Sequence, residues 1–467
     1  MRERSGTAAG QIRYPTVPLG LSVGGACDTR FAGVEEEFKR NFREHSEVGA
    51  SVCVRVGGAT VVDLWGGIAD PDTGRAWGLD TVGVIFSATL GAAATCVHLL
   101  AGRGEIDLER PVAAYWPEFA RKGKDQITIH DLLAHRSGVS AVREPLPEGA
   151  FFDPELMADL IAAEAPFFPP GQQHGFTGIC FGYVLDALIR RTDGRSLGRY
   201  FADELAGPLG LDFWIGSPPQ VEGRIAPMLL PEMDPVTAAE FFLLSTDHDS
   251  VPGLVLGNSG GYLSPGPRNF DCREGHAAQI PSTGGITNAR GLAALYEPLA
   301  FPGVDHHGVC FDAEAVAWLS TAHSAGYDHT LRHNTRYGLG YMLAVDNRWR
   351  PPRQRDSLLI GPHAFGHTGF GGTVGFADPT HGLSFGYTMN RMSSALSIGG
   401  RAQRLIDATY RSLGSLDEGE SDDQLPGGAE GTGSPCPAFS GSRNPLSASW
   451  PHLPSSATSW GPNSCAT

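Results

Sequence analysis

The residue best suited to covalent chemistry is Ser87, which stands between an apolar run and a stretch of small residues. The pattern of residues 84–94 predicts a helix that begins at this serine. A serine hydroxyl is a weak nucleophile unless a base within hydrogen-bond reach takes its proton. One helical turn further on, on the same face, stands Leu90, which cannot accept a proton. The sequence therefore predicts a nucleophile position without a neighbouring base.

Replacement bases are scarce in this chain, because its only lysines are Lys39, Lys122 and Lys124. Lys39 falls in a predicted amphipathic helix, and the other two fall in a charged loop where we expect them to be solvated. Two histidines, His174 and His367, remain as candidates for a substitute base, and His367 is the better of the two.

The elements that must position Ser87 are read from the periodicity of the chain. Residues 50–56 and 59–65 are β-branched runs joined by two glycines, which predicts a β-hairpin. Residues 86–244 are mainly helical in pattern, and strand patterns return over residues 337–345, 364–367, 372–378 and 383–389, before a last helix over 395–413. This order predicts one α/β domain whose sheet is closed by chain from both ends, with a helical part inserted.

Composition sets the limits of the domain and the class of partner. The 467 residues carry a formal net charge of −16, which argues against nucleic acid and anionic membranes as partners. Residues 1–30 are predicted to be a flexible arm without a signal peptide, and no segment reaches membrane-spanning length, so we expect a cytoplasmic protein. From residue 414 to 467 the chain is rich in Gly, Ser, Pro and acids, which predicts a disordered tail.

Metal and nucleotide chemistry find no support in the sequence. The eight cysteines are scattered singly, without the close pairs of a zinc site, and are expected to be free thiols. The glycine-rich residues 366–375 are not followed by a helix of phosphate-binding character. We therefore expect neither a metal nor a cofactor.

Four motifs in the right order resemble those of a known family. Phe86-Ser87-Ala88-Thr89 resembles the S-x-x-K motif of β-lactamases and penicillin-binding proteins. Residues 131–138 are similar to the family's "LLxHxSG" segment. Residues 170–176 are similar to the stretch that carries its catalytic tyrosine, and residues 366–372 are similar to its H-x-G strand. The resemblance covers about residues 31–413.

The resemblance implies a fold and a mechanism. The fold is a β-lactamase/transpeptidase-like α/β fold, with an antiparallel sheet flanked by helices (residues 31–85 and 286–413) and a mainly helical part (residues 86–285). In the class C and esterase branch the serine attacks a carbonyl while a lysine and a tyrosine move its proton. The oxyanion is held by the serine N–H and by an N–H of the last strand. In this chain the lysine position is Leu90 and the tyrosine position is Phe176.

Two hypotheses follow. The first is an esterase-type protein of this serine-hydrolase fold that is inactive or much weakened, a pseudoenzyme retained to bind a small ester, amide or acyl ligand. The ligand would lie at Ser87 among the residues Leu90, Phe176, His174, Gly369 and Gly371. The second is an active hydrolase, acyltransferase or metabolite-tailoring enzyme that uses the same cleft with a substitute base. His367 is the candidate for that base, because the matching strand lines the family's site.

Overall fold

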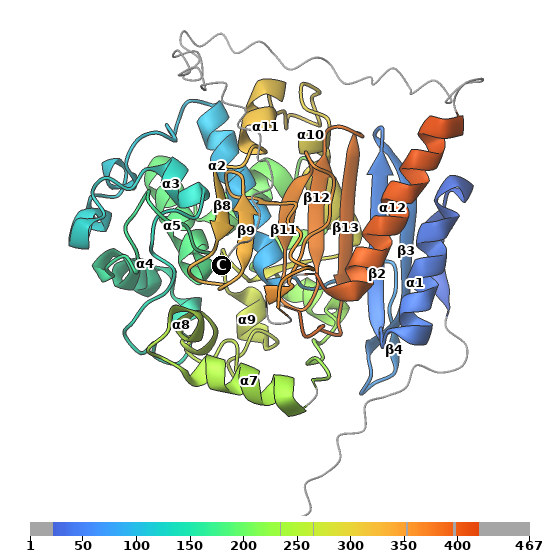
Figure 1. Cartoon of the computed structure of the whole chain (residues 1–467), viewed down its shortest axis with the longest axis horizontal. Coiled ribbons are helices and arrows are strands. Elements are labelled where there is room, and N and C mark those ends of the chain that lie inside the picture. The colour runs from blue at the N-terminus through green and yellow to red at the C-terminus, as the bar shows by residue number, and fades with distance from the viewer. Residues whose placement is uncertain (1–21, 234, 265, 352–353, 396–397, 420–467) are drawn as a thin grey trace, which may run out of the picture. The chain divides into compact units, whose positions relative to one another are not determined.

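The computed structural model of the chain describes residues 22–419 apart from 234, 265, 352–353 and 396–397. Ten described strands form one sheet in the order β1-β3-β2-β13-β12-β11-β10-β9-β8, with β4 paired to β3 (Figure 1). Every neighbouring pair is antiparallel. The strands are β1 Val23–Cys27, β2 Gly49–Val56, β3 Ala59–Asp70, β4 Arg75–Ala76, β8 Ser324–Tyr327, β9 Asn334–Tyr337, β10 Met342–Leu343, β11 Phe365–Thr368, β12 Val374–Asp378 and β13 Leu383–Met389.

The predicted closure of the sheet by both ends of the chain is confirmed. Strand β2 pairs with β13 along its length, from Ala50 opposite Met389 to Val56 opposite Leu383. The predicted hairpin is also confirmed, since β2 and β3 pair around two glycines that have the positive φ angles such a turn requires.

The first strand was not anticipated, because residues 23–27 lie inside the segment predicted to be a flexible arm. They form β1, which pairs with β3 at the edge of the sheet. Its sequence, VGGAC, carries no alternating pattern that would indicate a strand. A Cβ atom at Gly25, where φ is 110°, would overlap the backbone carbonyl of Asp63. This pairing therefore requires glycine at position 25, a requirement that an alternating residue pattern does not report.

Helices cover both faces of the sheet (Figure 1). On one face lie α1, Ala32–Glu44, and α12, Gly399–Gly419, whose Tyr410 stacks on Phe376 of β12. At the preceding position, Gly375, a side chain would point to the opposite face, where the ring of Tyr296 from α10, Ala289–Ala300, packs against the strand. Helix α12 runs six residues past the predicted end at 413, and the rest of the predicted tail lies outside the described residues.

The helical part begins and ends at a small second sheet. Its strands are β5 Gly83–Val84, β6 Phe213–Ile215 and β7 Gly285–Thr287, with β7 in the middle. β5 and β7 pair with each other, which brings Gly83 opposite Thr287 and Val84 opposite Ile286. The remaining helices of eight or more residues are α2 Thr89–Gly102, α4 Pro154–Ala163, α5 Gly178–Thr192 and α7 Pro235–Thr246. The shorter ones are α3 Ile129–Leu133, α6 Leu197–Phe201, α8 Val251–Gly257, α9 Arg273–Ala277 and α11 Ala313–Leu319.

Short 3₁₀ and π segments connect these elements. They are η1 Thr29–Phe31, η2 Phe86–Ala88, η3 Val112–Ala114, η4 Pro117–Gly123, η5 Ala150–Phe152, the π segment η6 Ala202–Ala206 and η7 Pro219–Arg224.

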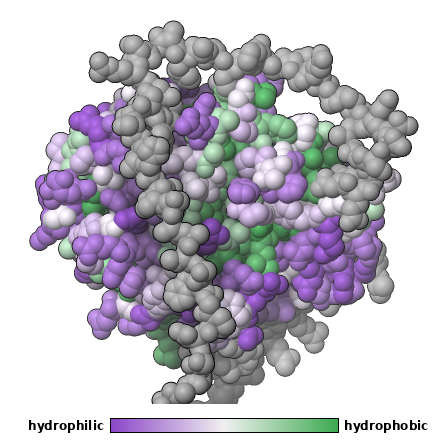
Figure 2. All heavy atoms as spheres, turned by 45° about the horizontal axis from the view of Figure 1, so that its top comes forward, coloured by the Kyte–Doolittle hydropathy of each residue, from purple (hydrophilic) through white to green (hydrophobic). Residues whose placement is uncertain are grey.

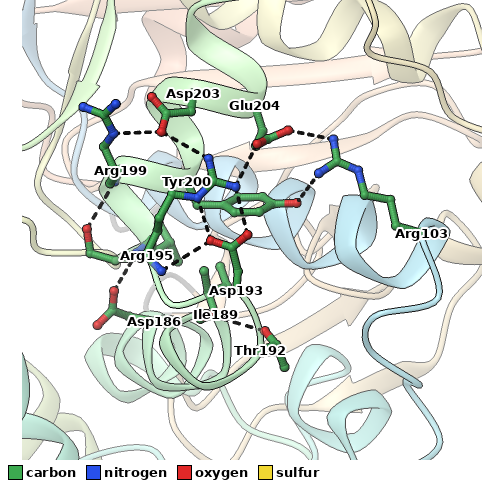
Figure 3. Close-up of polar contacts among 12 residues, drawn as sticks. Arg103, Asp186, Ile189, Thr192, Asp193, Arg195, Arg199, Tyr200, Asp203 and Glu204 are labelled. Atoms are coloured by element: carbon green, nitrogen blue, oxygen red, sulfur yellow. Dashed lines mark hydrogen bonds and ion pairs between the residues drawn. The ribbon is translucent and has the colours of Figure 1, made fainter.

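Helix α2, which Ser87 precedes, is buried over residues 89–100 and is built from small and apolar residues. A helix that is apolar on all sides belongs in the interior of a large domain. Its far end is fixed by ion pairs (Figure 3). Arg195 pairs with Asp193, Asp203 and Glu204, at 2.6, 3.1 and 2.8 Å. Glu204 also pairs with Arg103 directly after α2, at 2.7 Å, so that the network joins α2 to the α5–α6 connection.

The surface is mixed in character. In the face shown in Figure 2, hydrophilic residues cover much of the periphery and hydrophobic residues gather nearer the middle. Among the described residues the exposed large hydrophobic side chains are Leu79, Leu230, Phe242, Leu243, Tyr327 and Trp349. None of the helices in the described ranges is long and apolar enough to cross a bilayer.

Candidate active site

Ser87 lies in the single 3₁₀ turn η2 that leads into α2. The turn is held by Thr89, whose hydroxyl donates to the carbonyl of Phe86 at 2.6 Å and accepts from the N–H of Gly285 at 2.9 Å. Phe86 has a φ of 45°, an unfavourable value for a bulky residue. Its ring packs against Phe270 and Phe370, at centroid distances of 5.0 and 6.0 Å. Packing therefore holds a strained backbone directly before the serine.

The end of β11 packs closely against this turn. A Cβ atom at Gly369 would overlap the carbonyl oxygen of Ile85, two residues before Ser87. Gly371 has a φ of 90°, and a Cβ there would lie 2.8 Å from the Met392 side chain. Gly369 thus lets the chain after β11 approach the serine turn, while Gly371 lets it pass the Met392 side chain. Neither is among the described residues that line the cavity beside Ser87.

Leu90 lies in the first turn of α2 and is almost fully buried in the core. Its side chain offers no hydrogen-bonding atom, and it does not line the cavity. The family resemblance implies a general base at this position, and the leucine that occupies it has only a hydrocarbon side chain.

Phe176, in contrast, does line the cavity together with Ser87. Its N–H donates to both carboxylate oxygens of Asp328, each at 3.1 Å. Asp328 also accepts from the N–H groups of Thr330 and Leu331, at 2.9 and 2.8 Å, and is fully buried. This carboxylate therefore fixes the backbone that presents the Phe176 ring to the cavity.

His174 does not face Ser87 in this way. Its Nε2 lies 3.1 Å from the hydroxyl of Thr335, and that hydroxyl donates to Asp328 at 3.0 Å. The Thr335 oxygen must then accept from His174, so Nε2 of His174 carries its proton. His174 is absent from the described cavity lining and belongs to the Asp328 cluster.

His367 lines the cavity and is 2% exposed. Its Nδ1 lies 2.8 Å from the carbonyl oxygen of Thr368, which can only accept, so Nδ1 donates. Burial lowers the pKa of His367 to about 4, which leaves the ring neutral at pH 7. Its Nε2 is buried without a hydrogen-bond partner among the described residues.

His135, in the "LLxHxSG" segment, is fully buried among aromatic rings. Its Nδ1 accepts from the N–H of Thr177 at 3.1 Å. The ring lies between Phe176, Phe181 and Tyr337, at centroid distances of 5.4, 4.9 and 4.3 Å. It therefore supports the Phe176 segment from behind.

The prediction that Lys124 is solvated is wrong. Lys124, expected to be solvated, is fully buried, and its Nζ donates to the carbonyl oxygens of Arg121, Ala162 and Glu164. Three ammonium donors on three carbonyl acceptors satisfy the group, which explains its burial. Lys124 joins η4 to the end of α4 and does not line the cavity.

The cavity beside Ser87 has a volume of about 120 Å³ and is mainly apolar. It brings together three of the predicted site residues, Ser87, Phe176 and His367. Sequence analysis missed Thr283, His333 and Asp356, because they lie in loops that carry no recognisable motif. The full lining is Phe86, Ser87, Phe151, Phe176, Gly178, Ile179, Val255, Leu256, Leu263, Thr283, Leu331, His333, Met342, Asp356, His367, Thr368 and Phe370.

Within the described ranges, no group of three or more His, Cys, Asp or Glu side chains is arranged to hold a metal ion. Cys27, Cys53, Cys96, Cys180 and Cys272 are free thiols, of which Cys27 and Cys272 are only partly buried. The expectation of free thiols is wrong for Cys310, which is disulfide-bonded.

Comparison with known proteins decides the family. The model of the beta-lactamase family matches residues 38–409. The chain belongs to the beta-lactamase family. It is 33% identical over 387 residues to the esterase/beta-lactamase LipL of Mycobacterium tuberculosis, covering 81% of this chain and 85% of that protein.

Solved structures of this family share the same architecture. A family VIII carboxylesterase has a TM-score of 0.72 at 34% identity, covering 84% of this chain and 100% of the other. A penicillin-binding protein homologue from Caulobacter crescentus has a TM-score of 0.72 at 32% identity, with the same coverage. The fold and the family indicated by the four motifs are therefore confirmed.

Proposed function

We propose that this member of the beta-lactamase family is an esterase-type protein whose acyl transfer is much weakened, and that it binds a small ester, amide or acyl ligand in the cavity at Ser87. One observation carries the proposal. The two positions at which the family resemblance implies proton-moving groups, Leu90 and Phe176, hold hydrocarbon side chains, while the serine turn and the adjoining strand are kept.

The absence of proton-moving groups at positions 90 and 176 is expected to lower the rate of acyl transfer strongly. A positioned general base contributes about 10²–10⁴ in rate, and groups that act as a unit contribute more than any one of them. An oxyanion hole and binding alone leave about 10³–10⁴ over water. Turnover typical of an esterase would then require another base.

His367 is a poor replacement for that base. It is neutral with a free Nε2, but a group whose pKa is about 4 has little tendency to take a proton from a serine hydroxyl at pH 7. The charge of −16 supports a partner that is neither nucleic acid nor an anionic membrane. The ligand class follows from the apolar lining, which suits an acyl chain or an aromatic ring.

A second candidate is an enzyme that remains active by other means. It is favoured by the presence of two histidines, His333 and His367, in the same cavity as Ser87. If a covalent route operates, Ser87→Ala abolishes turnover. If the cavity catalyses a reaction without an acyl-enzyme, Ser87→Ala leaves the rate unchanged, and His333→Gln and His367→Gln identify the base.

The deciding experiment labels the full chain with a fluorophosphonate probe and measures hydrolysis of p-nitrophenyl butyrate. Labelling of Ser87 that is slow or undetectable, with hydrolysis near the uncatalysed rate, is the expected result. Ser87→Ala is the control for labelling elsewhere. Rapid, stoichiometric labelling of Ser87 would overturn the proposal.

A further inference from the structure

The side chain of His367 carries an acceptor that the protein itself does not use. Because Nδ1 donates to the Thr368 carbonyl, the neutral ring presents a lone pair at Nε2 and no proton there. Nε2 is buried and has no hydrogen-bond partner in the described part of the chain. Buried acceptors are nearly always paired, so an unpaired one in a cavity wall calls for a ligand.

The cavity walls add to this requirement. Thr283, whose buried hydroxyl lies near that of Tyr262, also lines the cavity. Most of the other lining is hydrocarbon, including Phe151, Phe176 and Met342. The volume of about 120 Å³ is close to that of an engineered apolar cavity of about 150 Å³ that binds benzene. A ligand portion the size of one aromatic ring, bearing one polar group, matches these walls.

The direction of the hydrogen bond selects the chemistry of that polar group. An acceptor at Nε2 is satisfied only by a ligand that donates, and ester, ether and ketone oxygens have no hydrogen to donate. Alcohols, phenols, protonated acids and amides do. Resting on the proposed binding role of this cavity, we propose that it holds an apolar ring or short chain whose O–H or N–H group donates a hydrogen bond to Nε2 of His367. The cavity then prefers the alcohol half of an ester over the intact ester.

The test uses two probes of nearly equal shape, 4-ethylphenol and its methyl ether 4-ethylanisole, titrated into the full-length protein at pH 7 by calorimetry. The phenol is expected to bind roughly tenfold more tightly, because only it pairs the buried acceptor. Equal affinity for the two probes, tighter binding of the ether, or no binding of either would overturn the inference. None of these results changes the outcome of fluorophosphonate labelling, which tests the weakened acyl transfer separately.

The residue responsible is identified by a matched pair of variants. In His367→Phe the preference for the phenol is expected to fall to within about twofold, while His381→Phe, at a partly exposed histidine that does not line the cavity, keeps it. Loss of the preference in His381→Phe, or its persistence in His367→Phe, would overturn the assignment. Should His367→Phe not fold, ¹⁵N-histidine spectra of the wild-type protein decide. The Nε2 resonance of His367 shifts with the phenol and not with the ether, and an unchanged resonance would contradict the inference.

Discussion

The aromatic ring of Phe176 lies 6.3 Å from the imidazole ring of His367, and both side chains line the cavity that contains Ser87. A hydrocarbon ring thus stands beside an unpaired nitrogen, at the place where the family resemblance implies a tyrosine hydroxyl. The site keeps a nucleophile and an apolar space, but hydrocarbon side chains stand at positions 90 and 176, where the family resemblance implies proton-moving groups.

Restoring those atoms should restore chemistry. In the double variant Leu90→Lys/Phe176→Tyr we expect hydrolysis of p-nitrophenyl butyrate to rise by about 10²-fold or more, because a base and a proton relay return beside Ser87. The variant Leu90→Met/Phe176→Tyr, which has a side chain of similar length at position 90 but no amine, serves as the matched control. A folded double variant with the wild-type rate would show that more than these two groups has been lost.

Stability should fall with pH below neutrality. Burial lowers the pKa of His98 and of His367 to about 4, against about 6.5 in an unfolded chain. Above pH 6.5 both states are neutral and these histidines contribute nothing to the slope. Between pH 6.5 and 4 the unfolded chain binds protons that the folded chain does not, so the free energy of unfolding drops by about 1.4 kcal/mol per pH unit for each histidine.

Urea unfolding between pH 4.5 and 7 measures that slope. His98→Gln and His367→Gln should each reduce it by a similar amount, because both histidines are buried and neutral. Only His367→Gln should also alter binding of 4-ethylphenol, since His98 does not line the cavity. An unchanged slope in both variants would mean that neither pKa is lowered by burial.

The contact between α2 and α10 can be tested by a compensating pair. A Cβ atom at Gly91 would overlap the hydroxyl oxygen of Tyr296, which is fully buried. Gly91→Ala should therefore destabilise the protein by about 1–3 kcal/mol through overpacking. Tyr296→Phe removes that oxygen, and combined with Gly91→Ala it should recover part of the loss. Strictly additive effects in a double-mutant cycle would contradict this contact.

Asp328 should be essential for the segment that carries Phe176. Besides the backbone donors described above, it accepts from the hydroxyls of Thr335 and Tyr337, at 3.0 and 3.1 Å. Asp328→Asn replaces one carboxylate oxygen with an NH₂ group, which cannot accept from the surrounding N–H and O–H donors. The substitution should therefore lower the free energy of unfolding by about 1–3 kcal/mol. Asp346→Asn, at an exposed carboxylate paired with Arg348, should leave the urea midpoint unchanged. Equal midpoints for both variants would show that Asp328 does not hold this segment.

Local pattern was enough to predict the parts of the fold that are repetitive. The hairpin around Gly57, the helix after Ser87 and the late strands are each specified by residues next to one another in the sequence. Residues 337–345 were predicted as one strand, but β9 ends at Tyr337 and β10 begins at Met342. The turn between them contains Gly340, with a φ of 82°, where a Cβ would overlap the side chain of Ala94 in α2. Only the packed structure reveals that constraint.

The site was predictable only where motifs marked it. Ser87, Phe176 and His367 come from three motifs, and the fold brings all three to one cavity. Thr283 and His333 reach the same cavity from loops, and nothing local distinguishes them from other loop residues. The burial of Lys124 depends on carbonyls about 40 residues away, at the end of α4, which no periodicity encodes.

The pairing of β2 with β13 has a consequence for how this protein is made. Ser51 and Thr388, which share a hydrogen bond of 2.9 Å, are 337 residues apart. During synthesis the edge of β2 that pairs with β13 stays unpaired until residues 383–389 have left the ribosome. Contacts of such high sequence separation slow folding and leave hydrophobic edges exposed to aggregation in the meantime. A chain truncated before residue 383 would lack the neighbour that completes the middle of its sheet, so we expect expression of this protein to depend on chaperones and on an intact C-terminal half.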